Sequence, residues 1–194
     1  MASRTSIANI AMSIIGNEPI SDLNESSDEA RLAKKYFDQA FASALAEYPW
    51  GWALVRKVLA ADAEPPEFGF KHRYMLPADC IRPFWVGHDD IELTEDQAWV
   101  REGDFILTDV EAPLQVKFTC RSKSLARMDP WIEDVCGASL ALRMMQTNRG
   151  SDTSVDRVQA IYNMWVSNAK RLEKTGGNMR RKAPPSGFEK AMER

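Results

Sequence analysis

The sequence contains few of the residues from which metal sites and reactive centres are built. Among 194 residues there are three cysteines and two histidines, and no C-x-x-C pair occurs. A structural zinc or iron–sulfur centre is therefore not expected. The cysteines, Cys80, Cys120 and Cys136, are odd in number and widely spaced, which favours reduced, mostly buried thiols and maturation in a reducing compartment.

Long apolar runs are also missing. No run approaches the roughly 20 residues of a membrane span, and the apolar stretch 7–15 is interrupted by Asn9 and Ser13 without a basic leader before it. We expect neither a secretory signal nor a membrane partner. The hydrophobic fraction of 44% and the charged fraction of 27% are ordinary for a globular protein, and they exclude collagen-like, mucin-like and wholly disordered chains.

Motifs that carry chemistry are absent from the sequence. It has no phosphate-binding loop, dinucleotide fingerprint, zinc-protease, hydrolase-elbow or calcium-loop pattern. His88-Asp89-Asp90 resembles a base beside its orienting carboxylate, but neighbouring residues in a turn rarely converge on one substrate. Cys136 could pair with His72 or His88 as a nucleophile, but it lies on an apolar helix stripe. We therefore expect no enzymatic activity, no metal and no cofactor.

Charge is distributed unevenly along the chain, although the formal net charge is only −3. Residues 62–111 hold 13 acidic and 4 basic residues, whereas residues 170–194 hold 8 basic and 3 acidic ones. The acidic middle would repel a phosphate backbone at short range, and the basic end could contact nucleic acid or an acidic protein surface. Solvated charge without a partner is the simpler interpretation of either segment alone.

The ends of the chain have helical periodicity. The pattern predicts a helix over 7–15 with Gly16 as its C-cap, and a second one that starts at Ser26 or Ser27 and reaches Tyr48. Asp129-Pro130 predicts the start of a third helix that ends at 148–150. A fourth is expected from Thr153 or Ser154 to the pair Gly176-Gly177.

Between these helices the period changes to two, which indicates strands. Strands are expected at 50–55, 72–76, 81–86 and 114–120, with a hairpin over 99–107. Pro83 predicts an edge strand or a bulge, and residues 87–97 are expected to form an acidic loop. Six tryptophans lie on stripes that favour core packing over base stacking: Trp50, Trp52, Trp85, Trp99, Trp131 and Trp165.

These elements predict an α+β fold. Residues 1–49 and 123–177 are expected to form the two halves of a four-helix bundle, because neither pair of helices can bury its apolar stripe alone. Residues 50–122 are expected to form an inserted small antiparallel β domain, and residues 178–194 an extended basic tail.

The order of five short segments resembles one known family. These segments are IANIAMSIIG at 7–16, ARLA at 30–33, YPWGWAL at 48–54, YMLPADCIR at 74–82 and EGDFILTD at 102–109. Their succession is similar to that of the tail tubular protein A family, the head–tail adaptors of short-tailed phages. The ending PPSGFEKA at 184–191 is also similar to the ending of that family.

The resemblance implies a non-enzymatic virion protein at the head–tail junction, assembled in the host cytoplasm. It implies a ring of twelve copies between the portal protein and the tail nozzle, with DNA passing through the lumen without sequence-specific binding. Tail fibres are a further partner that the resemblance allows. The alternative function is a nucleic-acid-binding protein that uses the basic C-terminal tail.

Two candidate sites follow from charge and from this resemblance. The first is an acidic loop that faces the channel or the nozzle and would let DNA slide without sticking; it comprises Asp89, Asp90, Glu92, Glu95 and Asp96. A hard cation is the other ligand considered for these residues, but they lack the spacing of a calcium loop. The second is a portal contact in the tail, comprising Arg180, Arg181, Lys182 and Phe188.

Overall fold

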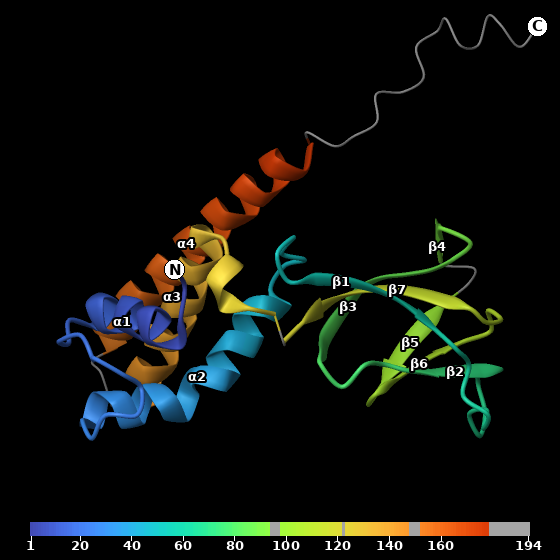
Figure 1. Cartoon of the computed structure of the whole chain (residues 1–194), viewed down its shortest axis with the longest axis horizontal. Coiled ribbons are helices and arrows are strands. Elements are labelled where there is room, and N and C mark those ends of the chain that lie inside the picture. Colours follow the sequence, from blue (N-terminus) through green and yellow to red (C-terminus); the bar gives the residue numbers. More distant parts are fainter. Residues whose placement is uncertain (94–97, 122, 148–151, 179–194) are drawn as a thin grey trace, which may run out of the picture.

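The structure is a computed structural model that describes residues 1–93, 98–121, 123–147 and 152–178. The described residues form four α-helices and two small antiparallel sheets, so the α+β prediction is confirmed at this level. We call the helices with their connections the helical part and the strands β1 to β7 the β part. The two parts lie side by side, and the chain runs from the helices into the strands and back (Figure 1).

The C-cap of α1 and the N-cap of α2 are those that the sequence predicts, whereas α1 begins before the expected residue 7 and α2 ends before the expected Tyr48. Helix α1 (Arg4–Ile15) starts with a capping box in which Ser3 and Ser6 exchange hydrogen bonds, and it ends at Gly16 with a φ of 83°. Glycine adopts this left-handed conformation without steric cost. Helix α2 (Asp28–Ala46) is capped by the Ser27 side chain and has two acidic residues in its first turn, which suits the helix dipole.

Helix α3 (Pro130–Thr147) is the centre of the helical part. It packs against α1, against α2 and against α4 (Asp152–Asn178). Gly137 permits the close approach of α1, because a Cβ at this position would lie 2.4 Å from Ile10 Cγ2 and 3.2 Å from the Ile7 carbonyl oxygen. On the other side, the buried Ser139 hydroxyl donates to the Ala40 carbonyl at 3.0 Å. Helix α3 can therefore occupy the central position, because small residues lie where its neighbouring helices come closest.

The β part consists of two facing sheets. One sheet has the order β1 (Leu54–Leu59), β7 (Leu114–Cys120), β3 (Cys80–His88), β4 (Ile91–Glu92). The other has the order β2 (His72–Met75), β6 (Phe105–Thr108), β5 (Trp99–Glu102). Their inner faces share one buried cluster, which includes Tyr74, Ile106, Val86, Val116 and Phe118.

Alternation along the strands places a different set of side chains on the outer faces. The expected strand at 114–120 and the hairpin at 99–107 are confirmed as β7 and as β5 with β6. Pro83 lies at a register shift between β3 and β7, so the predicted bulge is also confirmed.

Boundaries after α2 also differ from the prediction. Residues 50–53 form a turn, and the strand begins only at Leu54, because Trp50 and Ala53 are both buried in the helical core. Helix α4 starts at Asp152 and continues through both glycines to Asn178. Glycine costs about 1 kcal/mol in a helix but does not forbid one. Only the first residue of the expected tail, Asn178, is described, and residues 179–194 lie outside the described residues.

The side chains of the two parts form separate buried clusters. The helical cluster combines α1 and α2 with α3 and α4 and includes Trp50, Trp52 and Ala53 at the crossing into the strands. The other cluster belongs to strands β1 to β7. Each part therefore has its own core, and each candidate interaction surface described below lies on one of the two parts.

Candidate interaction surfaces

The structure separates the residues that could have formed a nucleophilic site. Cys136 lies in α3 inside the helical core, and burial raises the pKa of its thiol. Both histidines belong to strands of the other part. His88 Nδ1 lies 3.0 Å from the Pro113 carbonyl oxygen, and Nε2 lies 3.4 Å from Asp89 Oδ2. These contacts place the His88 ring at the β3–β4 turn on the surface, away from Cys136 in the helical core.

The described residues bear on two further kinds of site, a metal-binding cluster and a membrane-spanning helix. In the described ranges, no group of three or more His, Cys, Asp or Glu side chains is placed to hold a metal ion. Over the same part of the chain, none of the helices has the length and apolar character required to cross a bilayer.

The acidic loop expected at 87–97 is partly strand, and that prediction is wrong for its first half. Strand β3 continues to His88, and Ile91 and Glu92 pair back with it as β4. The connecting residues Asp89 and Asp90 have φ values of 48° and 64°, which is the backbone of a tight two-residue hairpin turn. The Asp90 amide is held by Gln115 Oε1 at 2.9 Å. The other two candidate residues, Glu95 and Asp96, lie outside the described residues.

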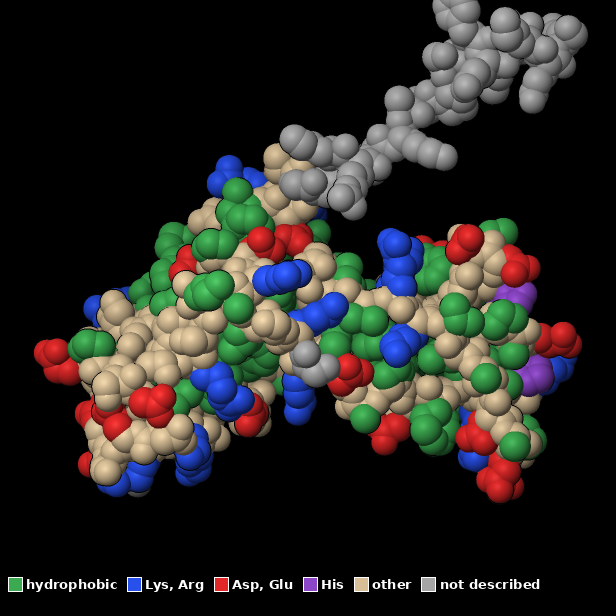
Figure 2. Space-filling model, in the orientation of Figure 1, with side chains coloured by type: hydrophobic (Ala, Val, Ile, Leu, Met, Phe, Trp, Pro, Cys, Tyr) green, Lys and Arg blue, Asp and Glu red, His purple; other side chains and the backbone are tan. Residues whose placement is uncertain are grey.

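Acidic side chains gather at the end of the β part that is distant from the helices. Red side chains mark this end in Figure 2. They come from three connections: the β3–β4 turn, the loop 62–71 and the segment that joins β6 to β7. The exposed acidic residues in the two latter segments are Glu64, Glu67, Asp109 and Glu111. The acidic end is therefore built from several loops, of which sequence analysis selected one.

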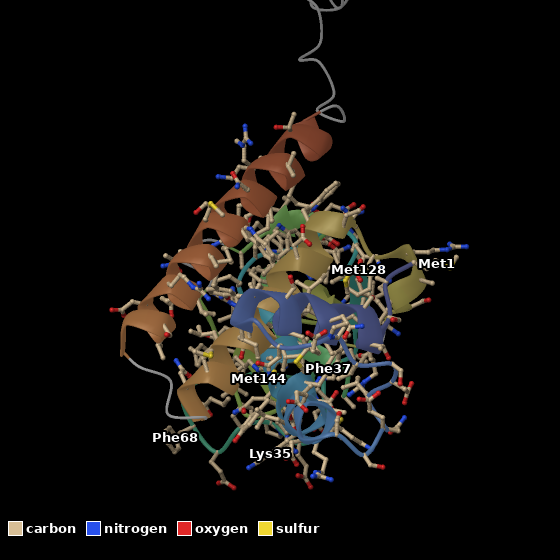
Figure 3. The ribbon with its side chains drawn as sticks, turned by 90° about the vertical axis from the view of Figure 1, so that its left-hand side faces the viewer. Met1, Lys35, Phe37, Phe68, Met128 and Met144 are labelled. Atoms are coloured by element: carbon tan, nitrogen blue, oxygen red, sulfur yellow. The ribbon has the colours of Figure 1, made fainter. Side chains whose placement is uncertain are left out.

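The loop 62–71, called here the Phe68 loop, has a fixed base and an exposed tip. Arg73 bonds Asp62 and Glu64, each at 3.0 Å, and the Lys71 amide donates to Asp109 Oδ1 at 2.9 Å. The pKa of the Asp62 carboxyl is lowered, first by the Glu64 amide and then by Arg73. Phe68 at the tip is 87% exposed, and it projects beyond the outline of the helices in Figure 3.

A basic hollow lies on the outer face of the four-stranded sheet. Its volume is about 410 Å³. In register, Arg56 of β1 lies opposite Lys117 of β7, and Lys117 lies opposite Trp85 of β3. The lining residues are Arg56, Lys57, Val58, Trp85, Asp90, Gln115, Val116 and Lys117. The alternation of side chains places Arg56 and Lys117 on this outer face, whereas Lys57, the next residue in β1, faces the other side. Figure 2 shows Lys and Arg side chains over this region of β1 and β7.

Gly87 and Lys117 hold the Trp85 indole in this hollow. A Cβ at Gly87 would lie 2.1 Å from Trp85 Cη2, so only glycine leaves room for the ring. The Lys117 ammonium lies 4.0 Å from the centre of one Trp85 ring, which is a cation–π contact. The core interpretation of the tryptophans holds fully for Trp50, which is 0% exposed, whereas Trp85 is partly exposed.

Sequence analysis missed this hollow because its residues are distant along the chain. Arg56 precedes the acidic segment 62–111 in the sequence, and Lys117 follows it. Their strands have outward positions at every second residue, and this alternation was the available signal. The register that joins them depends on pairing between β1, β7 and β3, which the sequence does not specify.

The residues expected to contact a portal lie outside the described residues. Arg180, Arg181, Lys182 and Phe188 all follow Asn178, the last described residue of α4. In the described part, the helical part offers a separate apolar hollow of about 660 Å³ between α1 and α4. Its apolar lining consists of Ile10, Ile14, Ile161, Met164 and Trp165.

Comparison with known proteins does not assign the chain to a family. No protein-family model matches it, and no curated protein matches it significantly. The surfaces described above and the order of the five sequence segments are therefore the support for a function.

Proposed function

We propose that this chain is a head-to-tail adaptor of a short-tailed phage virion. Twelve copies form a ring between the portal protein and the tail nozzle, and genomic DNA passes through the ring. The protein acts by binding and repulsion, without catalysis and without a cofactor. The observation that carries the proposal is the division of one short chain into two cores with dissimilar surfaces.

An adaptor has to bind different partners at its two ends, and the two parts suit this task. The helical part has a large core and an apolar hollow between α1 and α4. The β part has an acidic end and a basic face. We propose that the four helices act as one bundle that carries the portal-binding end, and that the β part faces the nozzle and the channel.

Repulsion explains how the channel would let DNA pass. A ring multiplies each charge by the number of copies, so a few exposed carboxylates per subunit create a strongly negative band. Such a band offers no cation to phosphate, which prevents the counterion release that makes proteins adhere to DNA. Of the candidate residues, Asp89, Asp90 and Glu92 are exposed at the far end of the β part.

We further propose that residues 179–194 form an extended tail that docks on the portal. Phe188 would be the apolar anchor, and Arg180, Arg181 and Lys182 would add charge contacts. The support for this is composition: residues 170–194 are strongly basic and contain the pair Pro184-Pro185.

The deciding experiment is electron microscopy of the purified chain mixed with the portal protein of the same phage. We expect rings of twelve at the tail-side end of the portal, with channel positions that are mainly acidic or neutral. Deleting residues 178–194 should leave a folded protein that no longer docks. A lumen lined by lysine and arginine would contradict the repulsion mechanism, and a monomer with enzymatic turnover would contradict the adaptor itself.

Nucleic-acid binding by the basic tail is the second candidate, because of the charge of residues 170–194. A gel shift with random DNA at moderate salt separates the two functions. Binding that is lost in the variant Arg180→Gln/Arg181→Gln/Lys182→Gln would favour the second candidate. The adaptor function predicts weak binding that this variant does not change.

A further inference from the structure

We infer that the Phe68 loop of one copy docks in the basic hollow of a second copy, and that this contact is the repeating joint of the ring. The inference rests on the proposed function for the ring, but the contact itself involves only residues of this chain. It gives a role to two features that do not stabilise the fold. These are the exposed side chain of Phe68 and the basic hollow on the outer face of the four-stranded sheet.

The Phe68 loop is shaped as a ligand. Its tip combines Glu67 with Phe68, which is 87% exposed, while Arg73 and Asp109 hold its base. An exposed phenylalanine on an anchored loop can enter a pocket at little cost in conformational entropy. Large aromatic side chains are also the usual anchors of protein interfaces.

The hollow is complementary to that tip in charge and in chemistry. Of its three cations, Arg56 and Lys117 face outward, whereas Lys57 follows Arg56 in β1 and faces the other side. The two outward cations are opposite in charge to Glu67 at the tip of the loop, while Glu64 is already paired with Arg73. None of the ion pairs found among the described residues involves these three cations.

Apolar contacts complete the match. Trp85 and Val58 supply apolar surface, and Val58 is 64% exposed in the free chain. A hollow of about 410 Å³ is within the range of about 300–1,000 Å³ that is common for binding pockets.

The loop and the hollow lie on opposite faces of the β part. The hollow is on the outer face of the four-stranded sheet. The Phe68 loop covers the outer face of the three-stranded sheet, where Pro66 to Phe70 line a second hollow with Arg73, Phe105 and Leu107. One chain therefore cannot fill its own hollow. A contact between opposite faces is heterologous, and this is the type of contact that closes into a ring.

Reversing one charge and then restoring the pair with the opposite change tests whether the Phe68 loop binds the basic hollow in the full-length chain. Self-association is measured by sedimentation at rising protein concentration and low salt. We expect Phe68→Ala to weaken it about 30-fold, as for an aromatic anchor. Glu67→Lys and Lys117→Glu should each weaken it about tenfold, and the two changes on separate copies, mixed together, should recover most of the loss. Met75→Ala, which removes another exposed apolar side chain (61%), and Lys35→Glu on α2 are matched controls without effect.

Crosslinking tests the geometry independently of the affinity. Phe68→Cys chains mixed with Val58→Cys chains should form a disulfide-linked heterodimer under mild oxidation, whereas Met75→Cys with Val58→Cys should not. All of these chains also carry Cys80→Ser, because Cys80 is half-buried, whereas Cys120 and Cys136 are buried and do not compete. Equal crosslinking of both mixtures would overturn the inference.

The outcomes separate this contact from the adaptor function. Rings on the portal that are insensitive to Phe68→Ala and to both charge reversals overturn the contact and leave the adaptor intact. Charge-swap rescue in a chain that ignores the portal supports the contact and removes the adaptor. A chain that stays monomeric both alone and with the portal overturns the contact. Lys117→Glu that reduces DNA binding without changing self-association also overturns it, because the hollow would then serve nucleic acid.

Discussion

The helical part and the β part use their large apolar side chains differently. Both parts contain large side chains that are completely buried, such as Trp50 and Ile132 in the helical part and Tyr74 and Phe118 in the β part, and the helical part exposes Met164 and Leu172 of α4. In the β part, the described residues include several large apolar side chains that are exposed by 41–87%: Val58, Phe68, Met75, Ile91 and Val100. The comparison teaches that one part supplies most of the apolar burial that stabilises a fold, while the other keeps apolar surface available for contact.

The sharpest test of this difference compares two tryptophans. Trp50→Ala should lower the free energy of unfolding by about 3–5 kcal/mol, because it leaves a cavity and removes the hydrogen bond that Trp50 Nε1 donates to the Ala44 carbonyl at 2.9 Å. Trp85→Ala should cost about 1 kcal/mol, since the partly exposed ring loses mainly its contact with Lys117. Urea denaturation measures both. Equal losses would show that the β part depends on Trp85 as a core residue.

Two glycines permit a second comparison, at the level of close packing. Gly137→Ala should cost about 1–3 kcal/mol, because the new Cβ meets Ile10 at the α1–α3 contact and this outweighs the better helix propensity of alanine. Gly87→Ala should displace Trp85 and disturb β4, since a Cβ there would also lie 2.4 Å from the Ile91 carbonyl oxygen.

Their effects should differ in kind. Gly137→Ala lowers stability and leaves self-association unchanged, whereas Gly87→Ala weakens self-association. Denaturation together with sedimentation distinguishes them, and a Gly87→Ala chain that associates normally would contradict the role of the basic hollow.

Alkylation of the cysteines compares how tightly the two cores are packed in the wild-type protein. Burial raises the pKa of Cys80 to about 11, and burial raises the pKa of Cys136 still further. At pH 8 both thiols should be protonated and slow to alkylate. We expect Cys80, which is only half-buried, to react before Cys136, and all three cysteines to react after denaturation. Mass spectrometry of the alkylated peptides gives the order, and rapid labelling of native Cys136 would contradict the packing of α3.

The smallest expected effect concerns the acid sensitivity of the connection before α2. The Ser21 hydroxyl, the Ser27 hydroxyl and the Ser21 amide donate to Glu25 and lower the pKa of its carboxyl to about 2. Because the folded pKa is below the ordinary value of 4.5, these bonds favour the fold above that pH. Their contribution disappears as the pH falls from about 4.5 to about 2.

An NMR titration of the Glu25 carboxyl measures this directly. Ser21→Ala should move the midpoint upward, and Ser27→Ala should move it less, in the order of the two contributions. A wild-type midpoint near the ordinary value would mean that the serine contacts do not persist in solution.

Local signals predicted much of the fold. Gly16, Ser27 and Asp129-Pro130 marked helix ends because caps act through neighbouring backbone groups. Strand 114–120 was recognisable because its side chains alternate between the core and the surface. Predictions failed where contacts between residues that are distant in the sequence determine the local structure. The turn at 50–53 forms because Trp50 packs among the helices, and Asp89-Asp90 turns tightly because β4 pairs with β3.

The sequence by itself determined the α+β class, the order of helices and strands, and the acidic character of the middle of the chain. These properties depend on periodicity and on composition, which are local. Only the tertiary structure decided that Arg56, Lys117 and Trp85 share one face, and that the Phe68 loop lies on the opposite one. The physical reason is that strand pairing joins residues some 30 to 60 positions apart, and a shift of one residue in register would turn each side chain to the other face.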